Sequence, residues 1–144
     1  MTPQVPRRAA VFALFWLCAC AGGPPTRLRS LATPTGQGAV SLEVHNGSDT
    51  VVNNLYLAPT AKVNAATREV RQDGSPELWG ADLLTRSALE VGGKLRVPVP
   101  GPGSYDIRAL SGDGRREQHI GRLRLEAGGR YVLELGEAGW RPVR

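Results

Sequence analysis

The residues that could carry out acid–base or nucleophilic chemistry are few and far apart in this chain of 144 residues. Its only histidines, His45 and His119, lie in separate stretches with strand-like alternation, at outward-facing positions. A hydrolase triad needs a nucleophile, a base and an orienting acid within hydrogen-bond reach. No serine stands in a nucleophile elbow, and no glycine-rich phosphate loop precedes a helix. We therefore predict no enzymatic activity. A small hydrolase would need one histidine to meet an acid and a hydroxyl in the fold.

Three aspartates, Asp82, Asp106 and Asp113, are the remaining candidates for a metal site. Calcium takes about six to eight oxygen ligands, so loops would have to bring all three together. Each also has a structural explanation. Asp82 suits the cap of a helical turn, Asp106 suits a pair with Arg108 or a backbone bond, and Asp113 suits a glycine-flanked turn. We predict no metal and no cofactor.

Aromatic residues and one proline are the candidates for contacts with other molecules. Trp79 and Tyr56 suit either a stacking platform for a sugar or peptide or, as we favour, the core. Trp140 lies in a short C-terminal tail, where we expect it to be exposed and available for an interaction. Pro98 cannot donate to a β-ladder and therefore predicts an edge strand, which is a second candidate for association.

The N-terminal segment has the pattern of an export signal. Arg7 and Arg8 precede a short apolar run over residues 9–21, which Gly22 and Pro24 interrupt. A membrane-spanning helix needs about 20 apolar residues, so we expect removal of this segment and not a permanent span.

The end of that run, Leu17-Cys18-Ala19-Cys20, resembles the lipobox of bacterial lipoproteins. The resemblance implies cleavage before Cys20, diacylation of its sulfur and attachment of the protein to a membrane by its lipid. Ala21 follows the cysteine where an Asp would favour the inner membrane, so we expect the outer membrane, facing the periplasm. The alternative is an ordinary signal peptide cut near Ala19 or Ala21.

The composition after export excludes several classes of protein. Removal of residues 1–19 takes away Arg7 and Arg8, so 18 basic residues become 16 against 13 acidic ones, and the net charge falls from +5 to +3. The basic residues are scattered among acidic ones, which argues against nucleic acid as a partner. Cys20 is the only cysteine left, so no intramolecular disulfide or cysteine-based metal site can form.

Three segments follow from these patterns. We predict a signal peptide over residues 1–19, a lipidated cysteine with a flexible tether over 20–37, and one folded domain over 38–144. The tether prediction depends on a composition rich in Gly, Pro, Thr and Ser without a periodic apolar pattern.

The folded part predicts an all-β domain. The expected strands cover residues 39–45, 50–57, 94–99, 104–110, 118–125 and 130–135. The first two are expected to form a hairpin across the turn at 46–49, and Ser111–Gly114 predicts a second hairpin. A short helical turn is expected between 61 and 84, and Gly121 suits a bulge. Six or seven short strands close naturally as a small antiparallel sandwich or a small barrel, and we expect the sandwich.

The chain also resembles a set of small exported bacterial β domains that are mostly uncharacterised. The resemblance lies in Asn46, in the motif Trp79-Gly80-Ala81-Asp82-Leu83-Leu84, in Tyr105-Asp106-Ile107-Arg108 and in Asp113-Gly114. It covers most of residues 39–135 and implies an immunoglobulin-like sandwich with no established activity. Unlike many related proteins, this chain has no cysteine in its second half.

These observations predict a membrane-anchored lipoprotein that interacts with an envelope protein or supports an assembly. The alternative is a periplasmic module that binds a glycan or a divalent cation.

Overall fold

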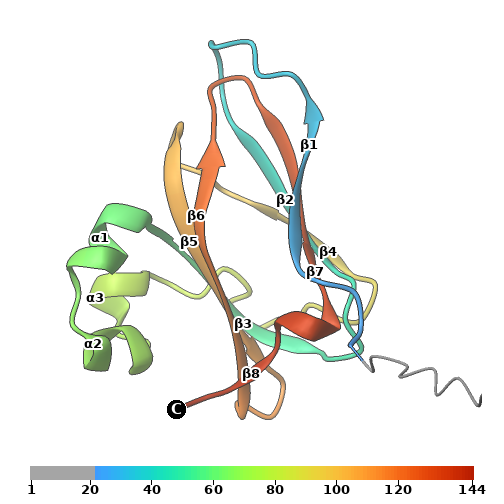
Figure 1. Cartoon of the computed structure of the whole chain (residues 1–144), viewed down its shortest axis with the longest axis vertical. Coiled ribbons are helices and arrows are strands. Elements are labelled where there is room, and N and C mark those ends of the chain that lie inside the picture. The colour runs from blue at the N-terminus through green and yellow to red at the C-terminus, as the bar shows by residue number, and fades with distance from the viewer. Residues whose placement is uncertain (1–21) are drawn as a thin grey trace, which may run out of the picture.

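The alternating stretches form two four-stranded sheets in the computed structural model, which describes residues 22–144 (Figure 1). The sheets pack face to face, so the predicted all-β sandwich is confirmed. One sheet has the strand order β1-β7-β2-β4 and the other the order β3-β5-β6-β8. The eight strands exceed the predicted six or seven because β1 and the two-residue β8 carry no recognisable alternation.

The bounds of the elements follow the chain. The first sheet contains β1 (Arg27–Ala32), β2 (Ser41–Asn46), β4 (Lys94–Val97) and β7 (Arg130–Leu135). The second contains β3 (Val52–Pro59), β5 (Gly103–Ser111), β6 (Arg116–Leu125) and β8 (Arg141–Pro142). Three short helices, α1 (Thr60–Ala65), α2 (Arg68–Gln72) and α3 (Pro76–Trp79), follow β3, and a 3-10 turn, η1 (Glu137–Gly139), precedes β8.

The prediction of a flexible tether over residues 20–37 is wrong for its central part. Strand β1 runs antiparallel to β7, with Arg27 opposite Glu134 and Ala32 opposite Arg130. Leu28 packs against the core, and Arg27 forms an ion pair with Glu134 at 2.8 Å. Because only one residue of β1 packs against the core, its sequence shows no alternating pattern that would predict a strand. The strand forms because β7 offers its free edge as the hydrogen-bonding partner of β1.

The hairpin predicted over residues 39–57 is also wrong. Strand β2 pairs antiparallel with β4 and parallel with β7, whereas β3 pairs with β5 in the other sheet. The connecting segment therefore crosses between the sheets. The buried Asn46 holds this crossing, because its Nδ2 donates to the carbonyl oxygens of Thr50 (2.8 Å) and Leu89 (3.0 Å). Alternation predicts the strands but does not identify their partners.

The second hairpin and the bulge are confirmed. Strands β5 and β6 pair antiparallel across the turn after Ser111. Tyr105 lies opposite Leu123 and Ile107 lies opposite Ile120, so β6 has one extra residue between these pairs. Arg122, next to Gly121, takes a positive φ of 60° at the bulge.

Inward-facing residues of both sheets form the main core. Leu42 and Val44 of β2 are fully buried, as are Ile107 of β5 and Leu133 of β7. A second, smaller cluster lies outside the β3-β5-β6 sheet and contains Ala58, Val63, Leu78 and Trp79. It joins the helices to the outer face of that sheet.

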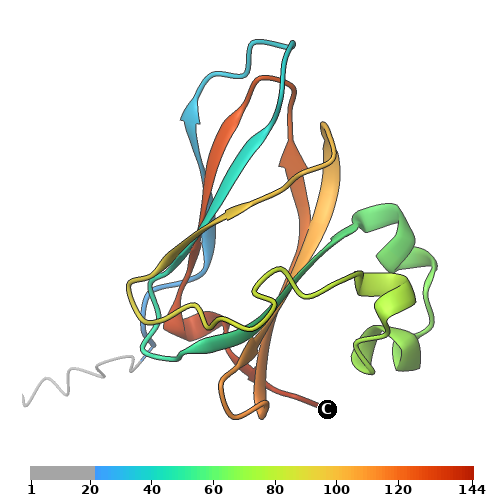
Figure 2. The ribbon, with the colours of Figure 1, turned by 180° about the vertical axis from the view of Figure 1, so that it is seen from behind.

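The segment α1–α3 replaces the single predicted helical turn and covers the outer face of β3 and β5 (Figures 1 and 2). Thr67 caps α2 by accepting a hydrogen bond from the amide of Val70, and Pro76 occupies the first turn of α3. The indole nitrogen of Trp79 donates to the carbonyl oxygen of Arg71 at 3.3 Å. Trp79 is therefore a core residue that fastens the helices to the sheet, and it is not an exposed stacking platform.

Candidate functional site

A cleft lies at the end of the sandwich where the linker after β1 and the turn after β6 meet, which is opposite the end where β1 begins. Its volume is about 950 Å³, within the range typical of ligand pockets. The linker between β1 and β2, the start of β5 and the end of β6 form its walls. The lining residues are Pro34, Gly36, Thr60, Pro102, Gly103, Ser104, Arg122, Arg124, Leu125, Glu126 and Ala127. We call this the distal cleft.

The position of the distal cleft follows from the strand directions. Strand β1 starts at Arg27, opposite Glu134, and ends at Ala32, opposite Arg130. The turn after β6 and the linker after β1 meet at this far end, where the amide of Gly36 donates to the carbonyl oxygen of Ala127 at 3.0 Å. The N-terminal end of the described chain and the cleft are thus separated by the length of β1.

Two hydroxyl groups connect the wall of the distal cleft to a buried carboxylate. Thr60 Oγ1 donates to Asp106 Oδ1 at 2.6 Å, and Ser104 Oγ donates to Thr60 Oγ1 at 3.0 Å. The backbone amide of Arg122, at the bulge, donates to the same Asp106 oxygen at 3.0 Å. Asp106 therefore accepts bonds from the start of α1 and from β6. Of its two predicted roles, the backbone bond is confirmed, and the pair with Arg108 is not formed.

His119 forms a hydrogen bond with the other carboxylate oxygen of Asp106. Its Nε2 lies 2.7 Å from Oδ2, and the indole of Trp79 meets the imidazole edge to face at 5.4 Å between centroids. Burial alone would raise the pKa of Asp106. The hydrogen bonds from Thr60, Arg122 and His119 outweigh burial and hold the pKa below its ordinary value. Asp106 is therefore an anion held in a fixed position.

The order of these groups differs from that of a hydrolase. A triad places histidine between the acid and the nucleophile, so that the imidazole removes the hydroxyl proton. Here Asp106 lies between Thr60 and His119, and both hydroxyls donate toward the acid. Such hydroxyls are not activated as nucleophiles. The set of residues positions the bulge and the helices.

A second buried charge lies beside Asp106 on the outer face of β5. Arg108 Nε donates to Glu117 Oε2 at 2.8 Å, and its Nη2 donates to the carbonyl oxygen of Gln72 at 2.9 Å. The helices cover the polar side chains on the outer face of β5 and thereby bury them. The sequence did not predict that Thr60, Ser104 and Gln72 take part in these polar contacts. The only pattern that could have indicated a polar layer is the alternation of polar and core residues along a strand, in a chain that also contains helices.

The other two aspartates have separate structural roles. Asp82 Oδ1 accepts the amides of Leu55 (2.9 Å) and Leu84 (3.1 Å), so it caps a turn as predicted, although that turn is not helical. Asp113 Oδ1 accepts from Ser111 Oγ at 2.6 Å inside the β5–β6 hairpin. Within residues 22–144, no three His, Cys, Asp or Glu side chains form a group that could hold a metal ion.

Pro98 lies just after β4, which is an edge strand as predicted. It is exposed and lines a groove of about 690 Å³ together with Val97, Val99 and Val40 and the basic residues Arg96 and Arg130. Its role in association stays a prediction.

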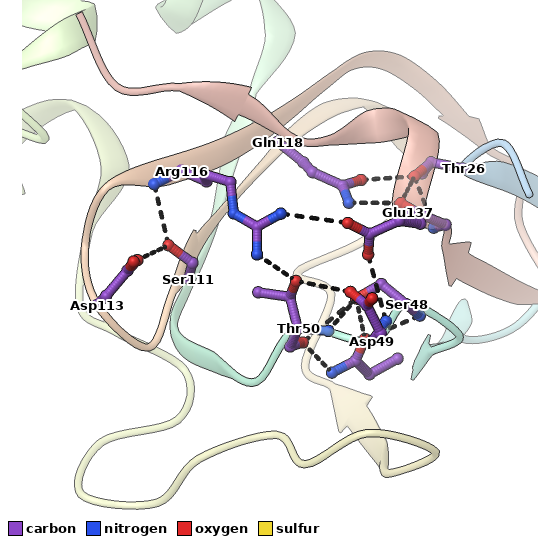
Figure 3. A network of polar contacts seen from close by, with 11 residues as sticks. Thr26, Ser48, Asp49, Thr50, Ser111, Asp113, Arg116, Gln118 and Glu137 are labelled. Atoms are coloured by element: carbon purple, nitrogen blue, oxygen red, sulfur yellow. Dashed lines mark hydrogen bonds and ion pairs between the residues drawn. The ribbon is translucent and has the colours of Figure 1, made fainter. Parts of the chain in front are cut away.

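Trp140 is buried, with 7% of its surface exposed, so the expectation of an exposed contact residue is wrong. It closes the main core, and the Arg116 guanidinium lies over its ring at 5.9 Å from the centroid. Figure 3 shows how Arg116 is held, since its Nη2 donates to Thr50 Oγ1 at 2.7 Å and its Nη1 contacts Glu137 at 3.2 Å. This network fastens the C-terminal segment to the link between the sheets.

The same network fixes the point where the chain enters the domain. Thr26 Oγ1 accepts from the amide of Gly136 at 2.8 Å, and Gln118 Nε2 donates to the carbonyl oxygen of Gly136 at 2.8 Å (Figure 3). The amide of Ala138 donates to the carbonyl oxygen of Pro24. The chain is therefore held against the domain from Pro24 onward, and Pro24 lies four residues after Cys20.

Cys20 and the segment predicted to be a signal peptide lie outside the described residues. Among residues 22–144, no helix is long and apolar enough to cross a membrane. Comparison with protein-family models, with curated proteins and with solved structures found no match to this chain.

Proposed function

We propose that the chain is a non-enzymatic envelope lipoprotein, attached through Cys20, that holds a segment of a partner protein in the distal cleft. The observation that carries this proposal is the position of the cleft at the far end of β1 from Pro24. A protein anchored through Cys20 has that end of the sandwich turned away from the membrane. The distal cleft then faces the compartment in which an envelope partner would be found.

The lining of the distal cleft favours an extended, acidic peptide segment. Pro34, Pro102 and Leu125 supply apolar surface, and Arg122 and Arg124 supply two exposed positive charges. Arg124 has a single partner within the described residues, Glu126 at 3.3 Å, and its side chain is 84% exposed. Such a guanidinium is available to a carboxylate of a partner.

The test is to purify the full-length tagged protein from detergent-solubilised membranes and to measure its intact mass and its co-purifying proteins. We expect cleavage before Cys20 and a mass increase from acyl chains. We also expect one envelope protein whose co-purification requires an intact distal cleft. Arg124→Glu should remove that protein from the eluate, whereas Arg86→Glu, an exposed change elsewhere, should retain it.

A Cys20→Ser form separates the two halves of the proposal. Loss of the acyl mass and of membrane association confirms the anchor. An unacylated protein that elutes alone would contradict the proposal. Thermal stabilisation by Ca²⁺ or by cell-wall fragments would then favour the alternative of a cation- or glycan-binding module.

A further inference from the structure

A second, smaller cleft lies between helix α2 and the outer face of β5 and β6. Its volume is about 310 Å³, and it shares no lining residue with the distal cleft. The lining residues are Arg68, Arg71, Gln72, Trp79, Arg108, Glu117 and His119. We call it the arginine cleft. Three arginines from two elements, α2 and β5, line this space.

Positive charge dominates the arginine cleft. Its only acidic lining residue, Glu117, is already paired with Arg108 at 2.8 Å. Arg68 and Arg71 form no ion pair with any residue between 22 and 144. Glu69, which lies between them on α2, is exposed and does not line the cleft.

The buried Arg108 supplies a fixed positive charge. Its side chain is only 5% exposed, and bonds to Glu117 and Gln72 hold Nε and Nη2. Nη1 makes no hydrogen bond within the described chain and lies against Gly74, where a Cβ would come within 2.5 Å of it. Gly74 has a φ of +67°, a backbone conformation that glycine adopts without strain. Because glycine has no Cβ, it also leaves space for Nη1.

His119 supplies a second oriented group. Asp106 holds its Nε2, and Trp79 packs against the ring, so the imidazole is fixed on two sides. Nδ1 has no hydrogen-bond partner between residues 22 and 144. Arg108 and this fixed ring line one cleft with Arg68 and Arg71, which form no ion pair among residues 22–144.

We propose that the arginine cleft binds a small ligand through a phosphate or carboxylate group. Guanidinium groups match the planar or tetrahedral oxygens of such anions with paired hydrogen bonds, and those bonds are stronger than neutral ones. Arg68 and Arg71 provide the more exposed charges of the cleft, and Arg108 provides the buried one. The volume limits the bound part to one anionic group with a few further atoms.

The test is calorimetric titration of the full-length protein in detergent with inorganic phosphate and, separately, with succinate, at constant ionic strength set with sodium chloride. We expect saturable binding of at least one anion. The double variant Arg68→Gln/Arg71→Gln should weaken it by about tenfold or more. The control Arg86→Gln, outside the cleft, should bind within about twofold of the unmodified protein.

Each outcome bears on the proposal. Phosphate alone binding indicates a phosphorylated ligand, succinate alone indicates a carboxylate, and binding of both indicates a general oxyanion site. No saturable binding of either anion overturns the proposal. Equal affinity of the double variant and the unmodified protein also overturns it, provided that thermal melting shows both to be folded.

Discussion

Asp106 is the residue on which the polar groups outside β5 converge, and its protonation should control the acid stability of the domain. It accepts hydrogen bonds from Thr60, Arg122 and His119, which hold its pKa below the ordinary value. Because the folded-state pKa is lower than the unfolded one, the stabilisation is complete above about pH 4 and is lost as the pH falls through the folded-state value. The carboxylate therefore stabilises the fold at neutral pH.

We expect Asp106→Asn to lower the free energy of unfolding at pH 7 by about 1–3 kcal/mol, because charge-assisted bonds are replaced by weaker ones. The same variant should lose less stability than the unmodified protein between pH 5 and pH 3. Urea denaturation at the three pH values measures both effects. Identical acid destabilisation of the two proteins would show that another group is responsible.

Trp79 tests whether the helices depend on the sheet for their stability. It is 1% exposed and contacts both His119 and the carbonyl of Arg71. Trp79→Ala should cost about 3–5 kcal/mol through lost burial and the resulting cavity. Thermal melting followed by circular dichroism measures the loss. Val70→Ala, an exposed change on α2, is the matched control and should alter the melting temperature little. An unchanged melting temperature in both variants would contradict the assignment of Trp79 to the core.

At the scale of elements, β1 gives a direct test of the corrected domain boundary. Leu28 faces the core, whereas Leu31 on the same strand is 54% exposed. Leu28→Asp should lower the free energy of unfolding by about 2 kcal/mol, because apolar burial is lost and a charge enters a half-buried position. Leu31→Asp should have little effect. If residues 27–32 were a free tether, neither change would alter chemical denaturation.

The sequence predicted elements better than it predicted their neighbours, for a physical reason. Alternation in 104–110 and 130–135 records which side chains face the main core, and both strands are present as β5 and β7. The same alternation fits any partner strand, so it could not show that β2 and β3 belong to different sheets. That arrangement depends on long-range contacts such as the bond from Asn46 to Leu89.

The candidate sites show the same difference between local features, which the sequence predicts, and long-range contacts, which it does not. The cap at Asp82 follows from local turn chemistry and was predicted, since its bonds reach the amide two residues along. The convergence of Thr60, Asp106 and His119 joins three elements that are distant in sequence. The burial of Trp140 depends on Arg116 and the end of the core, which the tail sequence does not reveal.

At the scale of the whole molecule, the docking of Pro24 would determine, in the proposed lipoprotein, how far the domain lies from the lipid on Cys20. Four residue steps separate the two positions, and an extended chain covers about 3.3–3.6 Å per residue, so the separation is at most about 14 Å. Since the amide of Ala138 bonds Pro24, the end that carries Asp113 should lie near the membrane. The distal cleft, with Thr35 in the linker beside it, should point away from the membrane.

We therefore expect a fluorophore on Asp113→Cys to be quenched by a quencher attached to lipid headgroups, and a fluorophore on Thr35→Cys to be quenched much less. Both residues are exposed, so the label should not disturb the core. The measurement uses the anchored protein in vesicles. Adding Cys20→Ser to each labelled variant is the control, and it should abolish quenching at both positions because the domain is released. Equal quenching at Asp113 and Thr35 in the anchored protein would mean that the domain tumbles freely at the surface, and the distal cleft would then have no fixed direction in which to meet a partner.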